Sequence, residues 1–374
     1  MKRKMFAFLL ALMPLSASAT RAEFILTPLT SFSDTGWLSP SDTTQLAGSN
    51  VQRGVAYNGA ADQVYVVDRN GGNFARIFQG SSGASVGNLD LTGLITGTPG
   101  GTFPLNMIDV ADDGAIYAAN LSNATSNFHI YRWANPTAVP TLAYSAVNGF
   151  PRTGDSFAVT GSGADTRIIA SGSTTSGISV FDTVDGISFT QTAANPFSGT
   201  PTPPAGALRL GLDFVDSSTA IGKQTGNTFY TAALNAEGVT PISTPLTTFS
   251  PSSLLNTNEN VPAFTTTGSI PLLATMETNS SLVRLYNATN LNSLVLLSSQ
   301  NLVTPFVANT NATGDLAFGM GPDGLRLYAL NTNNGIQAFN VSAVPEPSSI
   351  ALVTLGAVGI VARRRQLACR KQVS

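Results

Sequence analysis

The chain has 374 residues, of which only 11% are charged, and it contains 35 Gly and 21 Pro. So many chain-breaking residues and so few charges argue against a fold built from long, salt-bridged helices. The single His and single Cys argue against a His-based catalytic triad, a zinc cluster or a disulfide framework.

The net charge of −2 is unevenly distributed, because eight of the 19 basic residues lie close to the two ends of the chain. Between those ends, 11 basic residues stand against 20 acidic ones, and Lys223 is the only lysine. A body this acidic repels nucleic acids and anionic lipid headgroups. We therefore expect no nucleic-acid partner.

Residues 1–19 have the three parts of a secretory signal peptide. A basic segment at 2–4 is followed by an apolar run over 5–15 and by small residues at 16–19. Ala17 and Ala19 form the A-x-A pattern of a cleavage site, so we predict cleavage after Ala19. The alternatives are an uncleaved anchor or a buried N-terminal helix, but the apolar run is too short to span a bilayer comfortably.

Residues 20–343 contain a repeated unit of short strands. Runs of β-branched and aromatic residues recur between Gly, Asn, Asp, Ser and Pro, which is typical of an all-β fold. Each unit begins with a small apolar strand, continues through a tight turn such as Asn58-Gly59 into a second strand, and ends with an alternating third strand. The predicted first strands are 54–57, 108–111, 157–159, 212–215, 261–264 and 316–319.

The first strands recur every 46 to 58 residues, measured at Gly54, Asp109, Asp155, Asp213, Pro262 and Asp315. This period is that of four-stranded β-propeller blades rather than of solenoid turns, and six units predict six blades. A β-sandwich or β-helix is the alternative, although a sandwich seldom needs so long a repeat.

Fourth strands are visible in most units, for instance at 141–145 and 294–298, but the sixth unit has none. A strand at 24–29, directly after the signal peptide, belongs to no unit. We expect it to supply the missing strand and close the ring, which would cover two sheet edges.

Four aspartates recur near the start of the first strands: Asp109, Asp155, Asp213 and Asp315. In a propeller this strand is innermost, so the four carboxylates could gather around one mouth of the central channel and bind Ca²⁺, which takes six to eight oxygen ligands. The more ordinary interpretation is that each carboxylate accepts hydrogen bonds from backbone amides of a turn or of the next blade. We expect no cofactor, with Ca²⁺ at these aspartates as the alternative.

A strand at 128–133 places His129, Tyr131 and Trp133 on one face. Such a face could stack on a sugar, but it more often packs between adjacent blades. Because the body offers His129 neither a second His nor a Cys, no catalytic residue is predicted.

Residues 344–374 have the composition of a second targeting segment. Pro345, Glu346 and Pro347 precede an apolar stretch at 350–362, which is followed by a basic cluster, Arg363-Arg364-Arg365. The stretch has no polar face, which favours a short membrane helix over a core helix, and the arginines are expected on the cytoplasmic side. A plain tail anchor is the alternative.

This arrangement resembles the PEP-CTERM sorting signal of Gram-negative bacteria, whose three parts occur here in order. The resemblance implies that an exosortase, a membrane transpeptidase with a Cys nucleophile, recognises Pro345, Glu346 and Pro347 and processes the chain near them. It also implies an exported protein at the cell surface or outside the cell, anchored transiently in the inner membrane. Cys369 lies in the tail that processing would remove.

The first functional hypothesis is a non-enzymatic surface or extracellular-matrix protein whose propeller binds a partner protein or an exopolysaccharide. PEP-CTERM proteins as a family are associated with exopolysaccharide-producing, biofilm-forming bacteria. The alternative is a calcium-dependent propeller hydrolase or lyase acting on sugars or lactones. A scaffold without a small-molecule ligand is a third hypothesis, which the sequence does not separate from the first.

Overall fold

The computed structural model describes residues 23–46, 50–148, 150–174, 177–195, 204–223, 229–235, 238–240 and 259–344. Phe24–Ser342 form one compact unit, and residues 1–23 and 343–374 are grouped in a second. The signal peptide with Ala17 and Ala19, the Pro345-Glu346-Pro347 motif, the apolar segment 350–362 and Arg363-Arg364-Arg365 all lie outside the described residues. Among the described residues, no helix combines the length and the apolar character needed to cross a membrane.

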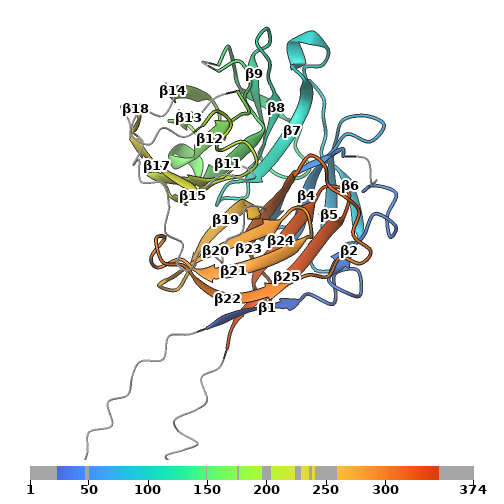
Figure 1. Ribbon diagram of the computed structural model, residues 1–374. Helices are drawn as coiled ribbons and strands as arrows, with labels where there is room; N and C mark the ends of the chain where they lie inside the picture. Colours follow the sequence, from blue (N-terminus) through green and yellow to red (C-terminus); the bar gives the residue numbers. More distant parts are fainter. Residues whose placement is uncertain are drawn as a thin grey trace, which may run out of the picture. The chain divides into compact units, whose positions relative to one another are not determined.

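The compact unit consists of six antiparallel sheets, here called blades 1 to 6 (Figure 1). Blade 1 contains β3 (Gln52–Asn58), β4 (Gln63–Asp68), β5 (Phe74–Gln79) and β6 (Ser85–Asn88). Blade 2 contains β7 (Phe103–Val110), β8 (Ile116–Leu121), β9 (Phe128–Trp133) and β10 (Thr141–Ala146). Blade 3 contains β11 (Ser156–Thr160), β12 (Arg167–Ser171), β13 (Ile178–Thr183) and β14 (Phe189–Asn195).

The second half of the ring repeats this pattern. Blade 4 contains β15 (Leu212–Asp216), β16 (Thr219–Gly222), β17 (Tyr230–Asn235) and β18 (Gly238–Thr240). Blade 5 contains β19 (Glu259–Thr267), β20 (Ile270–Glu277), β21 (Leu282–Asn287) and β22 (Val295–Gln300). Blade 6 contains β23 (Gly314–Gly321), β24 (Gly324–Asn331), β25 (Gly335–Ala343) and β1 (Phe24–Pro28). Two short 3₁₀ helices, η1 (Thr98–Gly100) and η2 (Gly163–Asp165), lie in connections.

The blades form a closed ring. The first strand of each blade contacts the first strand of the next, and β23 of the last blade contacts β3 of the first. The predicted six-bladed propeller is therefore confirmed, and the sandwich and β-helix alternatives are wrong.

Blade 6 is completed by the N-terminal strand, as predicted. Its strand order is β1-β25-β24-β23, so β1 is the outermost strand. A two-residue strand, β2 (Trp37–Leu38), also pairs with β25, and the sequence analysis did not anticipate it. The Leu26 amide donates to the Ser298 hydroxyl of blade 5 (3.1 Å), so β1 also joins blade 6 to its neighbour.

Tight turns and close approaches between inner strands determine where glycine occurs. Gly114 (φ 84°) and Gly324 (φ 125°) adopt positive φ in the first hairpins of blades 2 and 6, a conformation that glycine adopts without a steric penalty. At Gly54 an added Cβ would lie 2.7 Å from the Ile108 amide nitrogen of blade 2. A side chain there would push the first two inner strands apart.

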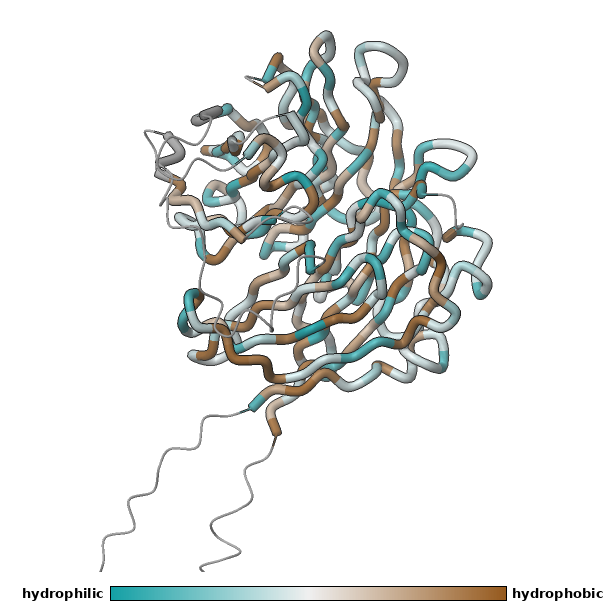
Figure 2. The backbone as a smooth tube through the Cα atoms, viewed as in Figure 1, coloured by the Kyte–Doolittle hydropathy of each residue, from teal (hydrophilic) through white to brown (hydrophobic). Residues whose placement is uncertain are grey.

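The apolar core is divided among the blade interfaces. Buried side chains of blade 3, such as Ile169 and Val180, pack with Leu212 and Phe214 of blade 4, and comparable clusters join blades 6 to 1, 1 to 2, 2 to 3 and 4 to 5. Figure 2 shows hydrophobic segments recurring along the strands between hydrophilic loops. Each blade is therefore stabilised chiefly by its neighbours, which is why the sequence signal is a repeat and not one continuous apolar run.

Candidate functional site

The six inner strands place two cavities in succession along the central channel. A cavity of about 360 Å³ is lined by residues at or just before the starts of inner strands, such as Arg53, Asp155 and Gly314. A second cavity, of about 270 Å³, is lined by later residues of the same strands, such as Tyr57, Thr160 and Gly319. We call them the entry cavity and the carboxylate cavity.

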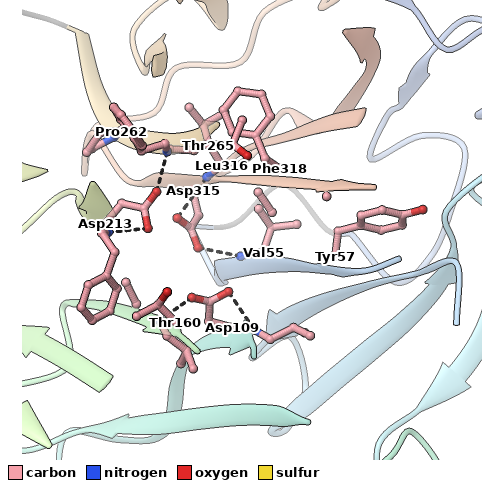
Figure 3. Close-up of a pocket in the computed structure, with 18 of the residues that line it drawn as sticks. Val55, Tyr57, Asp109, Thr160, Asp213, Pro262, Thr265, Asp315, Leu316 and Phe318 are labelled. Carbon is pink, nitrogen blue, oxygen red and sulfur yellow. Dashed lines mark hydrogen bonds between the residues drawn. The ribbon is translucent and has the colours of Figure 1, made fainter. Parts of the chain in front are cut away.

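Three of the four predicted aspartates line the carboxylate cavity: Asp109 of β7, Asp213 of β15 and Asp315 of β23. They come from blades 2, 4 and 6, so the carboxylates are supplied by every second blade. Figure 3 shows the three side chains extending from separate inner strands toward the middle of the cavity.

Each of these carboxylates accepts two backbone hydrogen bonds. One donor is the amide of the following residue, and the other is an amide of the inner strand in the next blade (Figure 3). The donors are Val110 and Val159 for Asp109 (2.8 and 2.7 Å), Phe214 and Phe264 for Asp213 (2.7 and 2.6 Å), and Leu316 and Val55 for Asp315 (3.0 and 2.9 Å).

The pKa values of these three carboxyl groups lie above the ordinary range for aspartate. Burial raises the pKa of Asp213 to about 7. Burial, together with the charge of Asp213, raises the pKa of Asp315 to about 8. The pKa of Asp109 lies well above its usual value, because burial and the charges of Asp213 and Asp315 all disfavour ionisation.

The hydrogen bonds of the three carboxylates join neighbouring blades. Both oxygens of each carboxylate already accept an amide hydrogen, and the bonds link blade 2 to 3, blade 4 to 5 and blade 6 to 1. Among the described residues, no three His, Cys, Asp or Glu side chains lie close enough to hold a metal ion. The three carboxylates thus satisfy backbone N–H donors of two neighbouring inner strands each.

Asp155 does not join the other three, so the alternative hypothesis of one ring of four carboxylates is wrong. Asp155 precedes the first residue of β11 and lines the entry cavity. There it forms a two-pronged ion pair with Arg152 (2.7 and 2.8 Å) and accepts the Ser173 amide (3.0 Å). The recurrence of Asp near each predicted first strand concealed that Asp109 is the seventh residue of its strand, whereas Asp155 lies outside its own.

The entry cavity is rich in arginine, which the sequence analysis missed. Arg53, Arg152 and Arg209 line it, and Arg69 lies over the ring of Phe103, another lining residue (3.6 Å to the ring centre). The sequence did contain a pattern that indicates this cluster, because in units 1, 3 and 4 an arginine occurs at or just before the start of the inner strand.

The His129 face packs between blades and is not available to a ligand. His129, Tyr131 and Trp133 are all buried, at 2%, 2% and 0% exposure. The Trp133 indole donates to the Asp90 carbonyl oxygen (2.7 Å), and His129 Nε2 lies 2.9 Å from the Pro99 carbonyl oxygen.

Comparison with known proteins identifies the C-terminal segment. Residues 343–366 match the PEP-CTERM protein-sorting motif, a span that includes Pro345-Glu346-Pro347 and Arg363-Arg364-Arg365. The motif implies export, transient membrane anchoring and processing by an exosortase-type enzyme. No curated protein sequence matches the chain.

Solved structures share the fold at low sequence identity. A DUF4623 family protein from Bacteroides eggerthii is 16% identical, with a TM-score of 0.60, over 81% of this chain and 74% of that chain. The Malassezia sympodialis allergen Mala s 1 is 10% identical (TM-score 0.49; 79% and 94% covered), and the PQQ-bound aldose sugar dehydrogenase from Streptomyces coelicolor is 16% identical (TM-score 0.47; 87% and 100% covered). The likeness to the Bacteroides eggerthii protein shows the fold alone.

Proposed function

We propose that this exported, exosortase-processed propeller is a binding protein of the Gram-negative cell surface or extracellular matrix, and that its partner is an exopolysaccharide or a surface protein. The observation that carries the proposal is the position of the propeller's ends. The chain enters through β1 and leaves through β25, the two outer strands of blade 6. The sorting signal is therefore attached to strands that do not line the channel.

A binding role fits the chemistry of the channel better than the calcium-dependent hydrolase or lyase. The oxygens of the three channel carboxylates already accept backbone amides. The entry cavity, in contrast, presents arginines in a body whose other charges are mostly acidic. Concave sites with a few convergent polar groups are the usual form of ligand-binding sites.

The C-terminal segment supports the proposed location. In this proposal 350–362 is a short membrane helix that holds the chain in the inner membrane until the exosortase acts at Pro345-Glu346-Pro347. The arginines at 363–365 remain on the cytoplasmic side. Processing then releases the propeller from the helix.

The test follows the protein in its producing cells. We expect the intact mass of the protein from the surface fraction to correspond to a chain that begins at Thr20 and ends near Pro345, and we expect this product to be retained on the producer's own polysaccharide. The triple variant Pro345→Ala, Glu346→Ala, Pro347→Ala should accumulate in the inner membrane with its tail attached. An untrimmed wild-type C-terminus would contradict the processing, and absence of retention would contradict binding to polysaccharide.

A further inference from the structure

The arginines of the entry cavity have too few acidic partners to balance them. Asp155 is engaged by Arg152, and the nearby carboxylate of Asp68 accepts both arms of Arg76 (3.1 and 3.0 Å). Within the described part of the chain, Arg53, Arg69 and Arg209 form no ion pair.

The unbalanced arginines are held close to one another. Burial, together with the charges of Arg209 and Arg152, lowers the pKa of Arg53 to about 10 despite the nearby Asp155. Burial and the charge of Arg53 lower the pKa of Arg69 to about 9. Arg53 and Arg69 remain charged at neutral pH, so the cavity concentrates positive charge inside an acidic propeller.

Several arginine donors are unused by the protein. The Arg209 side chain makes no hydrogen bond with any described residue, and the Arg53 guanidinium donates to the Gln52 carbonyl oxygen (2.6 Å) and, more weakly, to Thr332 (3.5 Å). A guanidinium has five N–H donors. N–H donors therefore remain on both side chains for a ligand oxygen. Each guanidinium is planar and can bind the two oxygens of a carboxylate through two parallel N–H groups.

The rest of the lining matches a sugar better than a bare anion. Thr102 and Thr313 offer hydroxyl groups, while Phe103 and Leu210 offer apolar surface. A sugar ring has hydroxyls around its edge and C–H groups on its faces, so it uses both kinds of lining. The volume of about 360 Å³ lies at the lower end of the range of small-ligand sites and suits one or two sugar units.

We propose that the entry cavity binds a hexuronate unit of an acidic extracellular polysaccharide, with the sugar carboxylate between Arg53 and Arg209. Arg69, held over the Phe103 ring and bonded to Asn106, adds positive charge beside this position. Arg152 remains paired with Asp155 and supports the wall of the cavity. This inference rests on the proposed binding function and names its ligand class.

The experiment is isothermal titration calorimetry of the processed protein with digalacturonate. We expect binding that weakens when NaCl is raised, since the interaction is between charges. Arg209→Gln removes one two-pronged, charge-assisted contact and should weaken binding by about tenfold or more. Arg209→Lys keeps the positive charge but cannot bind the carboxylate through two parallel N–H groups, so it should give an intermediate affinity.

The matched control is Arg132→Gln. Arg132 lies on β9 near the Tyr117 ring and is not among the residues that line the entry cavity. The variant loses the same charge, so it should bind digalacturonate as the wild type does. Circular dichroism of every variant establishes that it is folded before its affinity is compared.

Three results of these titrations would overturn the proposal. It falls if digalacturonate does not bind, if Arg209→Gln binds as tightly as wild type, or if inorganic phosphate or a hexaglutamate peptide binds as tightly as digalacturonate. Retention on the producer's polysaccharide without digalacturonate binding would overturn this assignment and leave the proposed function standing. Digalacturonate binding without retention on that polysaccharide would support the site and overturn the proposed function.

Discussion

At the scale of single residues, the channel aspartates couple stability to pH. The pKa values of Asp213 and Asp315 are raised to about 7 and about 8, mainly by burial, so the folded state holds protons that the unfolded state has already lost above about pH 4. Stability contributed by these protons is therefore lost as the pH rises toward 8.

We predict that thermal unfolding shows Asp315→Asn to be less stable than wild type at pH 5, because an amide nitrogen cannot accept one of the two backbone N–H groups; the cost is about 1–3 kcal/mol. At pH 9 the difference should shrink, since the wild type then carries a buried charge that the variant lacks. Asp34→Asn, at an exposed position, is the control and should leave the pH profile unchanged. A constant difference between pH 5 and pH 9 would refute the raised pKa.

At the scale of elements, the N-terminal strand closes blade 6. Leu26 is 1% exposed, and its amide and carbonyl bond to Ser298 and Gln300 of β22 in blade 5. The last blade and its contact with blade 5 therefore depend on the first strand of the compact unit, more than 270 residues away along the chain.

We predict that Leu26→Ala lowers the free energy of unfolding by about 2–5 kcal/mol, because it leaves a cavity. Leu26→Pro should cost more, since it also removes the amide donor. Urea unfolding followed by circular dichroism measures both. Equal stability of the two variants would mean that the amide of Leu26 contributes nothing to closure.

At the scale of the whole molecule, an ion pair connects the last blade to the first. Arg326 of β24 is 1% exposed and bonds to Asp62, in the turn between β3 and β4 (2.8 Å). The Tyr57 hydroxyl donates to the same carboxylate (2.8 Å), and the Tyr328 hydroxyl donates to the Gly80 carbonyl oxygen (2.7 Å). These contacts fix the interface at which the ring closes.

We predict that Asp62→Asn destabilises the entire ring by about 1–3 kcal/mol, because the buried Arg326 loses its shorter ion pair and keeps only the longer one to the exposed Asp323. The chain has two tryptophans, Trp37 in β2 beside blade 6 and Trp133 in blade 2. Fluorescence of the single-tryptophan variants Trp37→Phe and Trp133→Phe should give coincident unfolding midpoints, and adding Asp62→Asn should lower both midpoints together. A shift confined to Trp37 would show that the blades unfold independently.

The sequence by itself determined the fold class, the number of blades, the role of the strand at 24–29 and the sorting signal at Pro345-Glu346-Pro347. These follow from strand periodicity, turn residues and motif order, which are properties of short segments. The tertiary structure alone decided which end of the channel each polar residue occupies. Asp155 and Asp213 both stand near the start of a predicted first strand. Asp155, however, precedes β11 and pairs with Arg152 in the entry cavity, whereas Asp213 lies within β15 and bonds to the next blade. Loop length and strand start differ from blade to blade, so a shift of a few residues moves a side chain from one cavity to the other.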